Sequence, residues 1–117
     1  MKVVDRFFSA LLMFGAAGHT LGTILFYNWP SEVFVWSLGS SVAAFLLVAI
    51  NLLRVNRPDD RTLATICALG ATAWLCTVMA FGVVQGNLLD PRVLIHGVAA
   101  IGLLAMSLRS LEAAQDL

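Results

Sequence analysis

Four long apolar stretches, separated by short polar breaks, dominate the pattern of this chain. They cover about residues 7–27, 33–53, 62–86 and 91–109. Each approaches the roughly 20 apolar residues that a membrane-spanning helix needs. The first three contain no Asp, Glu, Lys or Arg, and Arg92 stands at the mouth of the fourth, where it can snorkel toward lipid headgroups. We therefore predict an all-α membrane protein, an up-down four-transmembrane-helix bundle that forms a single domain over residues 1–117.

The breaks between the stretches contain residues that start and stop helices. In "NWPSE" (28–32), Pro30 stands near the start of the second predicted helix. In "RVNRPDDR" (54–61), Pro58 is followed by Asp59 and Asp60, two acids that suit the first turn of the third helix. In "NLLDPR" (87–92), Asp90 can cap the fourth helix and Pro91 fits its first position. Short connections make successive helices antiparallel neighbours.

Composition indicates a lipid environment and argues against nucleic acid as a partner. Hydrophobic residues make up 60% of the chain and charged residues 12%, and the mean hydropathy is +0.90. A soluble domain has about 45–50% apolar and about 25% charged residues. The net charge is +0. Membrane lipids are therefore the expected surroundings, and the chain has no basic patch that would suit nucleic acid.

The basic residues predict the orientation of the bundle. Six fall on the side that holds both termini: Lys2, Arg6, Arg54, Arg57, Arg61 and Arg109. Only Arg92 falls on the other side. The positive-inside rule then places both termini in the cytoplasm, in a multi-pass protein of a bacterial-type inner (plasma) membrane. An alternative is that "MKVVDRFFSALLMFGAA" is a cleaved signal peptide, which would leave three spans.

The two histidines of the chain fall at similar depths in different predicted helices. His19 precedes Tyr27 by eight residues, about 12 Å from the non-cytoplasmic end of the first helix. His96 follows Pro91 by five residues, about 7–8 Å from the same end of the fourth helix. The two imidazoles can face each other if the first and fourth helices are neighbours. Gly15 and Gly22 share the helical face of His19 and leave a shallow groove beside it.

Further polar and aromatic residues gather in the same half of the bundle, and the cytoplasmic half is expected to be plainer. Intramembrane polar groups usually face the bundle interior and find partners there. We therefore predict a ligand site in the outer leaflet, without a named catalytic residue. Its candidate residues are His19, His96, Gln85, Trp74, Ser37, Gly15 and Gly22.

Two classes of function fit this pattern. In the first, the cavity binds a lipophilic ligand or redox cofactor: a quinone, a lipid, or a haem b whose iron would be ligated by His19 and His96. In the second, the chain is an accessory subunit of a larger membrane complex or forms a homo-oligomer. The histidines then serve only helix packing, beside the small-residue pattern of Gly18 and Gly22.

The sequence contains no motif that identifies an enzyme. The spans hold no acid to complete a three-ligand zinc or di-iron site with the histidines. Nucleophile-elbow and phosphate-loop patterns are also missing from the sequence. At the other end, Leu108, Leu111 and Leu117 suggest a modest apolar stripe on a cytoplasmic extension of the fourth helix. Such a stripe would suit a protein partner.

Overall fold

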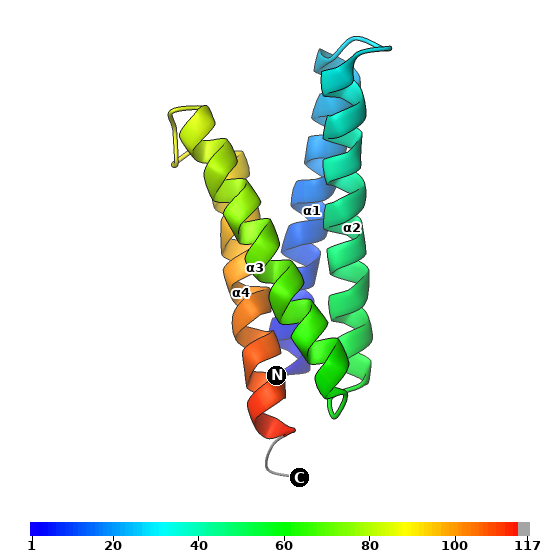
Figure 1. The fold of residues 1–117 in the computed structure, drawn as a ribbon, viewed down its shortest axis with the longest axis vertical. Coiled ribbons are helices and arrows are strands. Elements are labelled where there is room, and N and C mark those ends of the chain that lie inside the picture. The colour runs from blue at the N-terminus through cyan, green and yellow to red at the C-terminus, as the bar shows by residue number, and fades with distance from the viewer. Residues whose placement is uncertain (115–117) are drawn as a thin grey trace.

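The computed structural model describes residues 1–114, and four long helices make up most of this part of the chain. The helices are α1 (Lys2–Phe26), α2 (Glu32–Asn56), α3 (Arg61–Val84) and α4 (Pro91–Ala113). The prediction of an all-α four-helix bundle is confirmed. The start of α1, the end of α4 and the 57–60 loop lie at one end, here called the termini end (Figure 1). The 27–31 and 85–90 loops lie at the opposite, two-loop end (Figure 1).

The polar breaks supply side-chain caps for three helices, and the sequence predicts one of them, Asp90. Ser31 accepts a hydrogen bond from the Phe34 amide at 3.2 Å, so the cap of α2 is the residue after Pro30. Asp60 accepts one from the Leu63 amide at 2.9 Å. Asp90 caps α4, with Pro91 in its first turn. These side chains satisfy amide groups that have no partner within their own helix.

Three of the helices extend further at the termini end than the apolar stretches predict. α1 begins at Lys2 instead of about residue 7, α2 continues to Asn56, and α4 reaches Ala113. The extensions carry charged residues, and two of these are buried: Asp5 is 7% exposed and Arg54 only 1%. α4 thus extends beyond its apolar stretch as expected. Leu117, the last residue of the predicted apolar stripe, lies outside the described residues.

The bundle consists of two helical hairpins that converge at the termini end and diverge toward the two-loop end. α1 and α2 form one hairpin, α3 and α4 the other, and α1 packs beside α4 while α2 packs beside α3 (Figure 1). The first and fourth helices are therefore neighbours, which meets the condition under which the two histidines can face each other. The core combines small and branched residues from all four helices: Leu12, Ala16, Ala44, Leu47, Val48, Ala71, Ala99 and Leu103.

The outer surface of the bundle is strongly apolar. Large hydrophobic side chains remain exposed on every helix, for example Phe26 at 81% and Val84 at 83%. A soluble monomer rarely exposes apolar surface of this extent. All four helices are long and apolar enough to cross a membrane.

Candidate functional site

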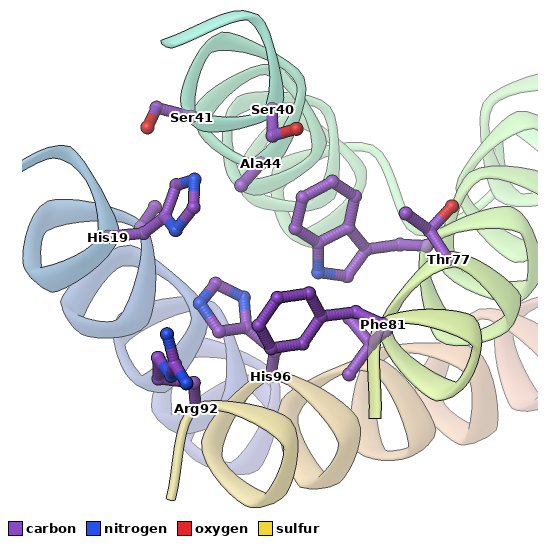
Figure 2. Close-up of a pocket in the computed structure, with 11 residues that line it drawn as sticks. His19, Ser40, Ser41, Ala44, Thr77, Phe81, Arg92 and His96 are labelled. Atoms are coloured by element: carbon purple, nitrogen blue, oxygen red, sulfur yellow. The ribbon is translucent and has the colours of Figure 1, made fainter. Parts of the chain in front are cut away.

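A cleft lies between the diverging hairpins at the two-loop end. It has two parts: a small pocket of about 110 Å³ and a wider groove of about 810 Å³. The parts share a set of lining residues: His19, Ser40, Phe81, Arg92 and His96. Figure 2 shows the two histidines, from α1 and α4, directed into the same pocket. The cleft therefore brings together residues from both ends of the chain.

The His19 imidazole is held by the backbone of α2. Its Nε2 donates a hydrogen bond to the Ser37 carbonyl oxygen at 3.1 Å. The Ser41 hydroxyl donates to the same oxygen at 3.4 Å. Ser37 thus contributes its carbonyl group to this contact. For His19, the structure matches the interpretation that a histidine bonds to a neighbouring helix and helps the helices pack.

The His96 imidazole, in contrast, is buried against α1 and has one nitrogen without a hydrogen-bond partner in the described chain. It is only 8% exposed and packs closely on α1, where a Cβ atom built on Gly15 would lie 2.8 Å from its Nε2. Its ring centroid is 5.7 Å from that of Trp74, with an interplanar angle of 51°. The buried Nδ1 has no hydrogen-bond partner among residues 1–114. Gly15 is therefore the glycine that allows α1 and α4 to approach each other beside the site.

The Trp74 indole provides a second unpartnered polar group in the same pocket. Its Nε1 is buried and finds no acceptor within the described part of the chain. Trp74 and His96 both line the small pocket. Because the large majority of buried polar atoms in native proteins are hydrogen-bonded, each exception calls for an explanation, such as a water or a ligand. Two lining residues that each carry a buried, unpartnered polar atom mark this pocket as the strongest candidate site.

Gly18 and Gly22 open onto the groove instead of forming a helix-packing seam. A Cβ atom built on either would meet nothing within 4 Å in the described chain. Both residues line the groove. The interpretation of this pair as a packing motif is therefore wrong within a single copy of the chain. Their missing side chains widen the groove.

Charged residues lie around the mouth of the cleft. Arg92 donates hydrogen bonds to both carboxylate oxygens of Asp90, at 2.9 Å from Nε and 2.8 Å from Nη2. Its guanidinium carbon lies 5.1 Å from the centroid of the Phe81 ring. These bonds lower the pKa of Asp90 to about 2. Glu32 also lines the groove, so the mouth carries one cation and two acids.

Six of the seven residues predicted for the site line the cleft, and Gln85 does not. Gln85 is the exposed C-cap of α3. The sequence argument placed Arg92 at the membrane surface and missed its contribution to the cleft. One signal was present: Arg92 and His96 are four residues apart in a helix and hence share one face.

A second polar cluster lies at the termini end, where the sequence predicted a plain interior. Arg54 forms an ion pair with Asp5 and donates from Nη1 to the Ser110 hydroxyl at 2.8 Å and the Met106 carbonyl at 3.2 Å. Asn51 accepts a longer bond of 3.4 Å from Arg54 Nη2. The expectation of a plainer half is therefore wrong, because Asp5 and Arg54, which flank apolar stretches, pair inside the bundle.

The geometry of the histidines does not fit a haem iron held between their rings. The Nε2 atom of His19 is bonded to the α2 backbone, and that of His96 lies against the α1 backbone at Gly15. A macrocycle between the imidazoles would have to displace both contacts. No group of three or more His, Cys, Asp or Glu residues within positions 1–114 is arranged to hold a metal ion.

Comparison with known proteins gives this chain no relative. No family model matches it, and neither the curated proteins nor the solved structures contain a significant match.

Proposed function

We propose that the chain is an integral membrane protein of a bacterial-type inner membrane, with the termini end in the cytoplasm. Four helices of sufficient length and apolar character support this placement. The exposed apolar side chains around the bundle would contact acyl chains. Six of the seven basic residues belong to the termini side, which supports the orientation. The cleft then opens in the outer leaflet.

We further propose that the cleft binds a lipophilic small molecule. The observation that carries this proposal is the pocket with two unpartnered polar atoms, Trp74 Nε1 and His96 Nδ1, beside a wider apolar groove. Ligand sites commonly combine apolar walls with a few polar groups that fix orientation. The pocket would take the polar end of the molecule and the groove its apolar part.

Purification in mild detergent, followed by solvent extraction and mass spectrometry, tests this function. The variant Gly18→Leu is expected to fill the groove, because Gly18 lines it and a Cβ atom there meets nothing within 4 Å. Gly39→Leu is the matched control, since Gly39 also has open space and lines neither part of the cleft. We expect one lipophilic compound to be retained by wild type and Gly39→Leu and lost from Gly18→Leu. Equal retention by all three proteins would contradict the proposal.

The alternative function is that of an accessory subunit or a homo-oligomer. The His19 hydrogen bond to Ser37 favours it, because this histidine has a packing role that needs no ligand. The exposed apolar helix faces would also suit a partner helix in the membrane. In that case, the chain should co-purify with a defined membrane protein or as a defined oligomer, and the extract should contain no specific compound.

A further inference from the structure

We infer that the ligand carries a neutral, oxygen-bearing six-membered ring of the quinone class, with its oxygen in the small pocket and its tail in the groove. This inference rests on the proposed function and specifies the chemistry of the molecule bound. Four observations carry it: the charge at the mouth, the two unpartnered polar atoms, the size of the pocket, and the open floor of the groove.

Charge at the mouth disfavours an anionic head group. Arg92 is the cation that lines the cleft, and both carboxylate oxygens of Asp90 already accept hydrogen bonds from it. Glu32 adds a further acid to the groove. A fatty-acid carboxylate would therefore meet a cation that is already neutralised and a second negative charge. A neutral head group has no such conflict.

The hydrogen-bonding chemistry of the two unpartnered groups, whose ring centroids lie 5.7 Å apart, suits a single oxygen. Trp74 Nε1 can only donate a hydrogen bond, whereas His96 Nδ1 donates in one neutral tautomer and accepts in the other. A carbonyl oxygen accepts from both groups when Nδ1 carries the proton. A hydroxyl oxygen accepts from the indole and donates to Nδ1 when it does not. The same pair therefore suits both the quinone and the quinol form of one ring.

Size and wall chemistry restrict the head group to about one ring. The pocket measures about 110 Å³ and opens to one side. This volume is below the roughly 150 Å³ of a cavity that holds one benzene ring, so the pocket takes at most part of one ring, and the rest of the ring must lie toward the groove. Phe81 and Trp74 supply aromatic walls against which a planar ring can stack. Gly18 and Gly22 leave the floor of the groove free for an alkyl chain. A single ring with an apolar tail suits the small pocket and the groove that continues from it.

Saturation binding to the full chain in phosphatidylcholine nanodiscs tests the inference, with empty nanodiscs as the baseline. The four probes are a decyl-substituted benzoquinone, its quinol, decylbenzene and dodecanoate. We expect the quinone and the quinol to bind, and decylbenzene and dodecanoate to bind at least about tenfold more weakly, because they lack the neutral oxygen. The carbonyl stretching band of bound quinone should lie at lower frequency than in empty nanodiscs.

Substitution at the pocket supplies the second measurement. Trp74→Phe keeps an aromatic wall and removes the donor, so quinone affinity should fall about five- to tenfold and the carbonyl band should shift back. Trp29→Phe is the matched control, because Trp29 lies 71% exposed and lines neither part of the cleft. The infrared shift in the wild-type protein decides the question even if Trp74→Phe does not fold.

The outcomes separate the two proposals. Equal affinity for decylbenzene or dodecanoate, or an unshifted carbonyl band, overturns the assignment of the head group and leaves lipophile binding intact. The same holds if a folded Trp74→Phe protein binds the quinone as tightly as Trp29→Phe does. Failure of all four probes to bind above empty nanodiscs, together with no extracted compound, removes the proposed function itself.

Discussion

The two polar regions of this bundle differ in how completely their groups are paired. At the termini end, Arg54 uses both Nη atoms in bonds to α1 and α4, and its charge is matched by Asp5. Only its Nε and the Ser9 hydroxyl remain buried without a partner among the described residues of that half. At the two-loop end, Trp74 Nε1 and His96 Nδ1 are buried beside a cleft without partners in residues 1–114. A paired cluster stabilises the fold, whereas an unpaired one costs stability and is retained where a ligand completes it. The difference thus separates a structural region from a candidate binding region.

The largest expected effect concerns the Arg54 cluster. Arg54→Met leaves the Asp5 carboxylate buried without its partner, which should lower the free energy of unfolding by about 3–5 kcal/mol. The measurement is unfolding in detergent micelles, followed by circular dichroism. The double variant Asp5→Leu/Arg54→Met removes both charges and should recover most of the loss. If the single variant is as stable as wild type, the ion pair does not hold the termini end together.

The next largest effect on stability concerns two glycines of α1. Gly15 packs against α4, whereas Gly18 faces the groove. Gly15→Ala places a Cβ atom 2.8 Å from His96 Nε2, so it should destabilise the bundle by about 1–3 kcal/mol. Gly18→Ala meets open space and should stabilise α1 by about 0.5–1 kcal/mol, because alanine favours helix more than glycine does. Unfolding curves of the two variants check this. The reverse order would mean that the helix faces are assigned incorrectly.

The two histidines should respond differently to replacement by leucine. His19→Leu removes a hydrogen bond between helices, a change that costs about 0.6 kcal/mol on average in membrane proteins. His96→Leu removes a buried Nδ1 that has no partner in the described chain and keeps an apolar side chain against Gly15, so it should cost no more stability than His19→Leu and should abolish retention of the ligand. Paired stability and extraction measurements test this. A stability loss at His96 larger than at His19 would assign His96 to packing.

The smallest expected effect lies at the mouth of the cleft. Asp90→Asn keeps a side chain that caps α4 and releases Arg92. The pKa of Asp90 lies at about 2, below its usual 3.8. Its ion pair therefore contributes stability above pH 3.8, and this contribution is lost as the pH falls through about 2. Stability of wild type and Asp90→Asn, compared between pH 7 and pH 1.5, should converge at the acid end. Curves that stay parallel would show that the ion pair contributes nothing.

The sequence predicts the helices and the pairing of successive helices because apolar length, capping residues and short loops are local signals, whereas the order of the helices around the bundle is not a local signal. The Asp90–Pro91 start of α4 is an example, and the similar depths of His19 and His96 follow from counting residues along the helices. Rotation of each helix about its axis is not a local signal. It decides that Gly15 touches His96 while Gly18 faces open space, and packing across the bundle sets it.

The pairing of Asp5 with Arg54 also lay beyond the sequence argument. Both residues flank apolar stretches, where charged side chains are expected at the membrane surface. Their contact depends on how far α1 and α2 continue as helices past those stretches, and on α4 lying alongside. Arg92 also lies at the end of an apolar stretch, and its place in the cleft follows from sharing a helix face with His96.

The Arg54 cluster also joins the two hairpins at the termini end. It fastens α1, α2 and α4 at one end, while His19 lies 14 residues along α1 from Asp5, about 21 Å away at 1.5 Å per residue. The cleft between α1 and α4 therefore lies far from the cluster that holds these helices together. A tilt of a few degrees between the hairpins, centred on the Arg54 cluster, would change the width of the cleft at the two-loop end by about an ångström. The cluster itself would hardly move.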